Sequence, residues 1–375
     1  MSISHRRIGV EEGLKSGLRN RWYVMLSSDK LGGQPVGVKA LGEKFVLWRD
    51  AQGKAHCFTD FCPHRGAPLS LGEVVNGELA CGYHGIRFDG EGACTAVPAE
   101  GEDSKLQKRL KMQAYPVQER AGLVWAYIGD VRLFPPSQLR LPPELESEDW
   151  SGFICNAHWK TNWLVALDNL ADPMHAPFLH GRSYTLRFGS KQDRMIVVDM
   201  PDGFRVEREK QKGINFDWSE LGDTGALWCR LDIPYPKSAG PGGPLRIVGF
   251  ITPNDENESE VYFLRYRQVQ GWQRKLWRTL YRTRLEARHW HVLEQDRVMM
   301  EAMDGLRARL GEHLSQTDVG VIRLRKMLNM EYARQQEIYR QAAEAERTAK
   351  EQSLASLLKS ESDQATAETA VSALD

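Results

Sequence analysis

The sequence has no long apolar run and no excess of charge of either sign. No stretch of the 375 residues approaches the ~20 consecutive apolar residues that a membrane-spanning helix requires. The 50 Lys and Arg residues balance 50 Asp and Glu residues, so we expect no overall attraction to nucleic acid or to an anionic membrane. Residues 1–20 are polar and charged without an apolar core segment, and the sequence therefore predicts no secretory signal peptide.

Cysteine is also scarce, and a dinucleotide-binding motif is missing. The chain has six cysteines, and Cys57, Cys94, Cys155 and Cys229 show no paired spacing. Reduced, unpaired cysteines are typical of the cytosol, so we expect a soluble cytoplasmic protein. No G-x-G-x-x-G follows an expected strand, and the sequence predicts no flavin or nicotinamide site in this chain.

Two short motifs, separated by sixteen residues, each contain one cysteine and one histidine. Cys62 and His64 lie in Cys-Pro-His, and Cys81 and His84 lie in Cys-Gly-Tyr-His. Two thiolates and two imidazoles suit a [2Fe–2S] cluster in which two His replace two Cys on one iron, the Rieske arrangement. Structural zinc sites can use the same four ligands, but they usually group like ligands together. Because each motif supplies one ligand of each kind, the spacing favours the iron–sulfur cluster over zinc.

A second group of metal-binding residue types follows at domain distance. Residues 168–180 read D-x₃-D-x₂-H-x₄-H, formed by Asp168, Asp172, His175 and His180. The two histidines can supply two positions of a 2-His-1-carboxylate site for mononuclear non-haem Fe(II), which leaves positions open for O₂. Two unconnected histidines beside helix-starting acids would give the same pattern. The upstream cluster motif favours the iron site, because a cluster that moves single electrons needs an acceptor.

Together the two motifs resemble the catalytic (α) subunit of the Rieske non-haem iron oxygenases, the aromatic ring-hydroxylating oxygenase family, from about residue 20 to about residue 340. The resemblance implies a carboxylate ligand to the iron on a long helix far downstream of the histidines. The segment 294–303 matches that helix, and Asp296 is the expected third ligand. The competing acids nearby are Glu294, Glu301 and Asp304.

The resemblance also implies roles for the two acids of the histidine motif. Asp172 is expected to bridge His175 to His84 of a neighbouring subunit, so that electrons cross between chains. A ligating histidine needs an acceptor for its other ring N–H, which makes this role physically sensible. A helix-starting acid is the alternative for Asp172. Asp168 is expected to support the site from behind the ligands.

The expected fold class is α+β, with an N-terminal all-β Rieske [2Fe–2S] domain and a C-terminal helix-grip catalytic domain, an antiparallel sheet gripped by helices. Short apolar runs such as 45–48 and 123–128, separated by Gly and Pro, predict the strands of the first domain. The paired prolines at 135–136 and 142–143 predict a linker. The expected divisions are an N-terminal segment 1–19, the Rieske domain 20–140, the mononuclear-iron domain 150–340 and a low-complexity C-terminal tail 341–375.

Within the second domain the sequence predicts a helix over 159–168 and strands that include 194–199 and 260–266. A long helical region over 271–309 carries Trp272, Leu276 and Leu280 at i, i+4 spacing, and we expect this stripe to face the core. The tail after Tyr339 has no aromatic residue and is expected to be a frayed helix or disordered.

The implied function is that of an oxygenase component that uses O₂ to mono- or dihydroxylate an aromatic substrate. Electrons are expected from a reductase or ferredoxin partner that uses NAD(P)H, and the resemblance implies a homotrimer. An O- or N-demethylase or another monooxygenase of the same family is the first alternative, and an electron carrier with an inactive second domain is the other.

The substrate is not readable from the sequence, but its pocket should involve residues between about 200 and 295. Aromatic and basic side chains there are candidates for the pocket, although core packing is the more common role of an aromatic residue in a sheet, and the arginines cannot be separated from surface charge. These candidates are Phe204, Phe216, Trp218, Trp228, Phe250 and Phe263, with Arg230, Arg246 and Arg265 for an anionic substrate.

Overall fold

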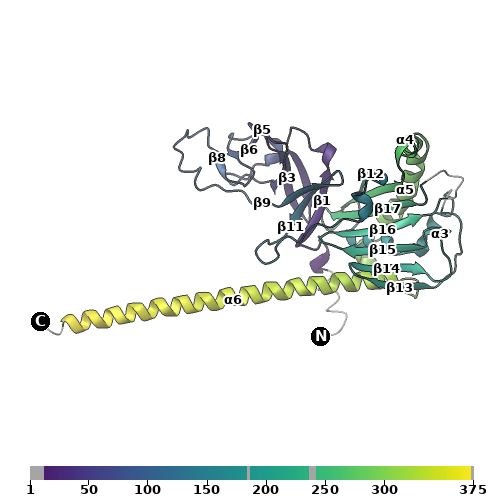
Figure 1. Ribbon diagram of the computed structural model, residues 1–375. Helices are drawn as coiled ribbons and strands as arrows, with labels where there is room; N and C mark the ends of the chain where they lie inside the picture. The colour runs from purple at the N-terminus through teal and green to yellow at the C-terminus, as the bar shows by residue number, and fades with distance from the viewer. Residues whose placement is uncertain (1–11, 184–185, 236–241, 373–375) are drawn as a thin grey trace.

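The computed structural model describes residues 12–183, 186–235 and 242–372, so most of the expected N-terminal segment lies outside the described residues. The first eleven strands form three small antiparallel sheets, ordered β1-β11-β10, β2-β3-β4-β9 and β5-β6-β7-β8 (Figure 1). The strands are β1 Arg21–Ser27, β2 Val36–Ala40, β3 Glu43–Arg49, β4 Ala55–Thr59, β5 Glu73–Val75, β6 Glu78–Ala80, β7 Arg87–Phe88, β8 Cys94–Ala96, β9 Ala114–Tyr115, β10 Val117–Arg120 and β11 Leu123–Ile128. Short 3₁₀ turns lie at η1 Ser28–Lys30, η2 Leu69–Leu71 and η3 Pro143–Leu145.

The second part of the chain is built on one seven-stranded antiparallel sheet of order β12-β18-β17-β16-β15-β14-β13. Its longer strands are paired over most of their length, as with β17 and β18. The strands are β12 Trp150–Trp159, β13 Met195–Met200, β14 Gly203–Arg208, β15 Trp218–Asp223, β16 Leu227–Ile233, β17 Leu245–Pro253 and β18 Ser259–Gln268.

Helices cover one face of this sheet, and the N-terminal domain packs on the other. Successive side chains of a strand point to opposite faces. In β18, Val261 and Phe263 pack with the helices, whereas Tyr262 and Leu264 pack against Trp125 of β11 and its neighbours. The helical elements are α2 Trp163–Leu170, η4 Pro173–His175, α3 Ala176–Leu179, α4 Gly271–Leu280, the π-helical turn η6 Tyr281–Leu285, α5 Glu286–Ala302, η7 Gly305–Leu310 and α6 Val319–Ser372. The expected α+β class is confirmed.

The short segment before β1 belongs to the core of the C-terminal domain. Leu14 and Leu18 are 1% exposed and pack in the cluster that joins the sheet to α2, α5 and α6. The indole N–H of Trp163 donates to the carbonyl oxygen of Leu14 at 2.8 Å. From Leu14 on, the chain therefore passes from one domain into the other and returns.

Two local predictions about helices were wrong. Trp159 ends β12, and α2 begins only after Asn162, whose side chain accepts a hydrogen bond at 2.9 Å from the N–H of Leu164. The expected core stripe on α4 faces solvent instead, since Trp272 and Leu276 are 68% and 41% exposed. The buried residue of that helix is Trp277, and its indole N–H donates to the carbonyl oxygen of Ser151 at 3.0 Å.

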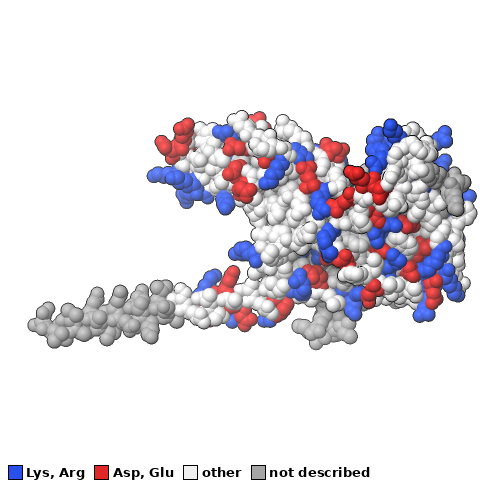
Figure 2. Space-filling model, viewed as in Figure 1, with Lys and Arg blue, Asp and Glu red and all other residues white. Residues whose placement is uncertain are grey.

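The C-terminal tail continues as part of α6, which leaves the sheet and extends away from both domains (Figure 1). Leu324 and Leu328 anchor the start of α6 in the core, and Tyr339 lies against Phe134, with ring centroids 5.2 Å apart. Beyond this point, residues with high helix propensity, mainly Ala, Glu, Gln and Lys, sustain the helix. Figure 2 shows basic and acidic side chains interspersed over the visible face of both domains.

Candidate metal centres

The first pair of motifs lies on two loops with the same backbone turn. The N–H of Cys62 donates to the carbonyl of Ala67 at 2.9 Å, and the N–H of Cys81 donates to that of Ile86 at 2.8 Å. In each loop the glycine four residues after the cysteine, Gly66 or Gly85, has a positive φ and donates back to the cysteine carbonyl. Glycine adopts this conformation without strain, so each loop can close tightly around its ligands.

The four side chains of these loops converge in pairs. Cys62 and Cys81 are 1% and 2% exposed, and burial together with the neighbouring Cys81 thiol raises the pKa of Cys62 to about 11. The rings of His64 and His84 lie with their centroids 4.8 Å apart, and Nδ1 of His64 is buried without a hydrogen-bond partner. Two thiols side by side and two imidazoles side by side fit the ligand set of a Rieske cluster.

The second group comes together from segments more than a hundred residues apart. His175 ends η4, His180 follows α3, and Asp296 lies within α5. The Nε2 atoms of His175 and His180 lie 3.5 and 3.2 Å from Oδ1 of Asp296. One ligand atom from each of the three residues falls within 4.8 Å of the others. This arrangement fits a 2-His-1-carboxylate iron site.

Local sequence explains why the two histidines converge. Pro173 and Pro177 cannot sit inside a continuous helix, so the chain breaks after α2 and restarts in two short turns. Asp172 starts the first turn by accepting a hydrogen bond from the N–H of Met174 at 2.8 Å.

Each of the three candidate ligands is held by a further polar group. His175 Nδ1 contacts the backbone carbonyl oxygen of Asp172 at 2.5 Å, and His180 Nδ1 contacts Oε1 of Gln295 at 3.0 Å. The side-chain amide of Asn169 donates to Oδ1 of Asp296 at 3.4 Å. Such partners orient ligating side chains and turn the Nε2 atoms toward the metal position. Sequence reasoning missed Asn169 and Gln295, whose only signal is that each adjoins a predicted site residue.

Electrostatics at this site reflect burial and the close carboxylate. Burial lowers the pKa of His180, but the hydrogen bond and charge of Asp296 raise it above its ordinary value overall. Burial raises the pKa of Asp172, although His175 opposes that rise. The carboxylate of Asp172 lies 3.8 Å from Nδ1 of His175 and borders a depression on the protein surface.

The other acids of the two motifs have partners elsewhere. Asp168 pairs with Arg309 and Arg325 at 2.5 and 2.7 Å and makes no contact with the three candidate ligands. The three competitors of Asp296 are also engaged: Glu294 and Glu301 pair with Arg297, and Asp304 pairs with Arg307.

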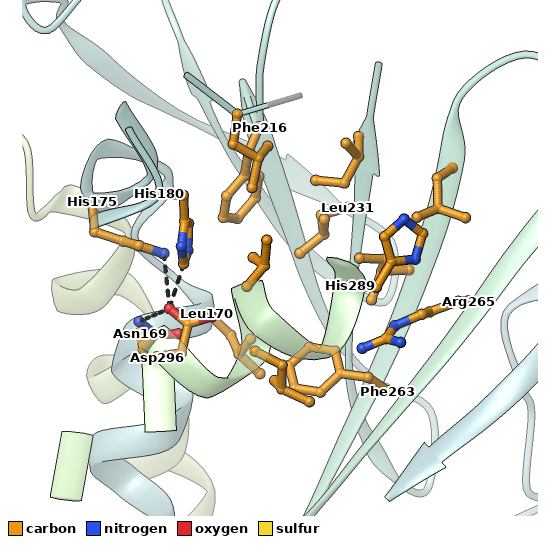
Figure 3. Close-up of a pocket in the computed structure, with 16 residues that line it drawn as sticks. Asn169, Leu170, His175, His180, Phe216, Leu231, Phe263, Arg265, His289 and Asp296 are labelled. Atoms are coloured by element: carbon orange, nitrogen blue, oxygen red, sulfur yellow. Dashed lines mark hydrogen bonds and ion pairs between the residues drawn. The ribbon is translucent and has the colours of Figure 1, made fainter. Parts of the chain in front are cut away.

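An apolar cavity opens beside the histidines (Figure 3). Of the aromatic candidates, Phe216 and Phe263 line it, whereas Phe204 and Phe250 belong to the packed core. Of the basic candidates, only Arg265 lines it. The other lining residues are Asn169, Leu170, His175, His180, Leu186, Leu231, Ile233, Leu245, Ile247, His289, Val292, Leu293 and Asp296.

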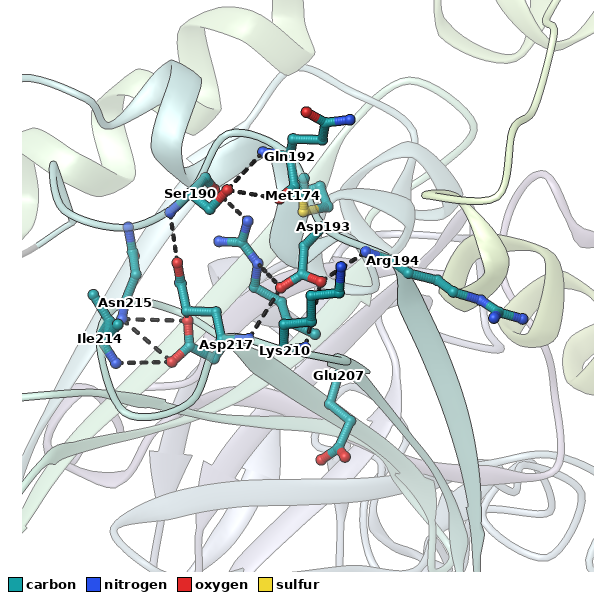
Figure 4. A network of polar contacts seen from close by, with 12 residues as sticks. Met174, Ser190, Gln192, Asp193, Arg194, Glu207, Lys210, Ile214, Asn215 and Asp217 are labelled. Atoms are coloured by element: carbon teal, nitrogen blue, oxygen red, sulfur yellow. Dashed lines mark hydrogen bonds and ion pairs between the residues drawn. The ribbon is translucent and has the colours of Figure 1, made fainter.

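A buried polar network holds the loop that carries Phe216 (Figure 4). The carboxylate of Asp217 accepts from the N–H of Ile214 at 2.9 Å and from the side-chain amide of Gln211. Arg208, which is fully buried, lies 3.6 Å from the carboxylate of Asp193. These contacts fix the wall of the cavity that faces His175, whose ring centroid lies 5.9 Å from that of Phe216.

The domains and their two centres define a Rieske oxygenase subunit, and comparison with known proteins agrees. Residues 21–116 match the family model of the Rieske [2Fe-2S] domain, and residues 159–333 match that of the vanillate O-demethylase oxygenase C-terminal domain. The chain belongs to the Rieske non-haem iron oxygenase family. The cofactors of this family are a Rieske [2Fe–2S] cluster and a mononuclear non-haem iron.

Individual relatives support this assignment. The chain is 31% identical over 255 residues to 4beta-methylsterol monooxygenase of Methylococcus capsulatus, covering 65% of this chain and 67% of the relative. It is 34% identical over 189 residues to a vanillate O-demethylase oxygenase subunit of a Pseudomonas species, covering half of each chain. The chain thus spans about half the length of some curated relatives that it matches.

Solved structures share the fold. Pseudomonas putida CBB5 NdmA with caffeine superposes with a TM-score of 0.72 at 20% identity, covering 89% of this chain and 96% of NdmA. Dicamba monooxygenase bound to dicamba gives a TM-score of 0.65 at 22% identity, covering 85% of this chain and 98% of the other. No helix in the described part of the chain is both long and apolar enough to cross a membrane.

Proposed function

We propose that this chain is the oxygenase component of a Rieske-type system that uses O₂ and external electrons to hydroxylate an aromatic substrate. The observation that carries the proposal is the convergence of His175, His180 and Asp296 at one end of an apolar cavity, in a chain that also carries a Rieske domain. O-Demethylation is the specific alternative, favoured by the family match over residues 159–333 and by a relative named dicamba O-demethylase at 33% identity.

In this proposal each group of residues has a defined task. Cys62, His64, Cys81 and His84 hold the cluster, and His175, His180 and Asp296 hold the iron. When bound, the cluster supplies single electrons and the iron supplies open positions for O₂. The apolar side chains of the cavity exclude water and place the substrate beside Asp296, while Asn169 and Gln295 keep the candidate ligands in position.

Electrons would pass between subunits of a homotrimer, from His84 of one copy through Asp172 to His175 of the next. Two exposed apolar surfaces support this route. The first surrounds the cluster loops and includes Phe61, Leu71 and Tyr83, each more than half exposed. The second borders the depression at Asp172 and includes Phe178, Met299 and Met303, which are 58%, 44% and 46% exposed. Apolar patches of this kind mark contact surfaces between proteins.

The remaining components of the system follow from the same proposal. A reductase or ferredoxin partner would deliver electrons from NAD(P)H to the cluster. The proposed domains are residues 20–140 and 150–340. A cytoplasmic location is supported by the six cysteines, all of them in the described residues and all free of disulfides.

The first test is metal analysis of the purified protein with EPR after dithionite reduction. Three irons and two acid-labile sulfides per chain, with a Rieske-type signal and substrate-dependent O₂ uptake, are the expected result. A Rieske signal with two irons, and no O₂ uptake after Fe(II) is added, would instead mean a pure electron carrier. Zinc without an EPR signal would refute both. Product analysis then separates the two reactions, because demethylation releases formaldehyde and ring dihydroxylation gives a cis-diol.

A further inference from the structure

We propose that the cavity beside His175 and His180 takes a substrate with a single carboxylate, which pairs with Arg265 at the opposite end. This inference rests on the proposed oxygenase function and deepens it by naming the chemical class of the substrate. Figure 3 shows the guanidinium of Arg265 pointing into the cavity from β18, across from the two histidines and Asp296.

Arg265 is a buried cation that contacts uncharged groups within the described part of the chain. Its side chain is 2% exposed and lines the cavity. Nη1 donates to the hydroxyl of Tyr281 at 2.6 Å, and the guanidinium lies 5.3 Å from the ring centre of Trp290. Burial raises the pKa of Tyr281 above its ordinary value, so this hydroxyl stays neutral.

Three other arginines of the described chain, one buried and two half-buried, are paired with acids. Arg21 lies 2.8 Å from Asp223, and Arg230 lies 3.2 Å from Glu144. Arg246 pairs with Asp232 and also with Glu144. Arg265 makes no such pair in the part of the chain that the structure describes. Because an unpaired buried charge is strongly destabilising, an anionic ligand is the missing partner.

The surroundings of Arg265 set the charge and shape of that ligand. His289 lines the same end of the cavity, and its Nε2 lies 2.7 Å from the hydroxyl of Tyr235. Burial, with the positive charges of Arg265 and Arg288, lowers the pKa of His289 to about 3, so the ring is neutral. One positive charge matches one negative charge, and a planar guanidinium matches a carboxylate. A doubly charged phosphate would leave a negative charge buried.

The walls between the two ends are apolar. Phe216 and Leu231 lie between Arg265 and the histidines, and no acid apart from Asp296 lines the described cavity. The substrate therefore has an apolar body, with its carboxylate held away from the carbon that reacts. The carboxylate also fixes which end of the bound substrate lies at Arg265 and which end lies beside the histidines.

The test compares acids with their neutral amides on the iron-loaded full-length protein. The probes are benzoate, phenylacetate, cyclohexanecarboxylate and naphthoate, each paired with the corresponding carboxamide, and binding is measured by calorimetry and by the shift in thermal midpoint. The variants are Arg265→Met and Arg265→Lys. Arg267→Met is the matched control, because Arg267 is a buried arginine two residues along β18 that does not line the cavity.

We expect at least one acid to bind the wild type about 10- to 100-fold more tightly than its amide, the effect of a charge-assisted hydrogen bond. Arg265→Met should abolish this preference, Arg265→Lys should keep part of it, and Arg267→Met should keep it. Without ligand, Arg265→Met should melt no lower than the wild type, because it removes an unpaired buried charge.

Two results would overturn the inference. One is that no acid binds better than its amide. The other is that Arg265→Met melts as far below the wild type as Arg267→Met, which would make Arg265 a structural residue. The proposed function is tested separately by O₂ uptake. O₂ uptake with amides alone would support the oxygenase function and refute the carboxylate inference. Acid binding through Arg265 with no O₂ uptake by the fully metallated protein would support the carboxylate inference and refute the oxygenase function.

Discussion

Replacing Asp168 by Asn should destabilise the protein without removing the mononuclear iron. Asp168 lies on α2 and forms ion pairs with Arg309 of η7 and Arg325 of α6, at 2.5 and 2.7 Å. The side chain of Asp168 is 16% exposed, and those of the arginines are 6% and 15% exposed. Arg325 also pairs with Glu312. The carboxylate therefore joins three elements around the site.

The expected loss in the free energy of unfolding follows from this burial. Removing one partner of a buried ion pair costs about 3–5 kcal/mol, because the remaining charge has no counterion. Asn keeps the shape of Asp and one acceptor oxygen, and Arg325 keeps Glu312, so the lower end, about 3 kcal/mol, is expected. For a domain of this size each kcal/mol lowers the thermal midpoint by about 2–4 °C, which gives a drop of about 6–12 °C.

The assay is the thermal midpoint of the C-terminal domain, measured with iron content before and after heating. Asp199→Asn is the matched control, because Asp199 pairs with Arg323 of α6 at 2.7 Å but is 78% exposed. An exposed pair contributes little, so this control should change stability by less than about 1 kcal/mol. If Asp168→Asn keeps the wild-type midpoint but loses iron, Asp168 acts at the metal and the structural explanation is wrong.

Three other substitutions test the proposed centres. Asp172→Asn should leave both metals bound but slow electron transfer from cluster to iron about 10- to 100-fold, the usual effect of losing a group that holds a metal ligand. The rate is measured as cluster reoxidation in a single turnover, and a normal rate would exclude Asp172 as the bridge. His175→Ala should remove one iron of three while the reduced-cluster EPR signal persists, and loss of that signal would contradict two separable sites. Asn169→Ala should weaken iron binding about 10- to 100-fold in a chelator competition, because Asp296 loses a hydrogen bond; unchanged affinity would mean that this contact is incidental.

The candidate metal ligands could be proposed from the sequence because metal chemistry restricts residue type and spacing so strongly. Cys62, His64, Cys81 and His84 are identifiable from two short motifs whose turns are local. Asp296 required the family resemblance, since an acid on a helix carries no local sign of a metal. The supporting residues could not be found, because Asn169 reaches Asp296 only when α2 packs on α5.

The cavity could be predicted in composition but not in detail. Strand alternation assigns Tyr262 and Phe263 to opposite faces of β18, but it does not say which face meets the helices. The exposed stripe of α4 shows the same limit, because apolar residues at helical spacing identify a face without identifying its partner. Arg265 differs from Arg230 and Arg246 through the acids that fold beside those two and through its own place on the cavity wall, and neither difference is visible in the sequence.

The placement of Leu14 and Leu18 constrains how the chain can be made and shortened. These residues leave the ribosome before the Rieske domain, yet their packing partners Trp163 and Leu164 emerge about 145 residues later. During synthesis the segment that contains these two leucines stays exposed to solvent until the second domain is complete. A truncated chain that starts at residue 150 would lack both leucines and leave a hole beside α2. Supplying residues 12–19 as a separate peptide should fill that hole, although the sheet face that packs on the first domain would stay uncovered.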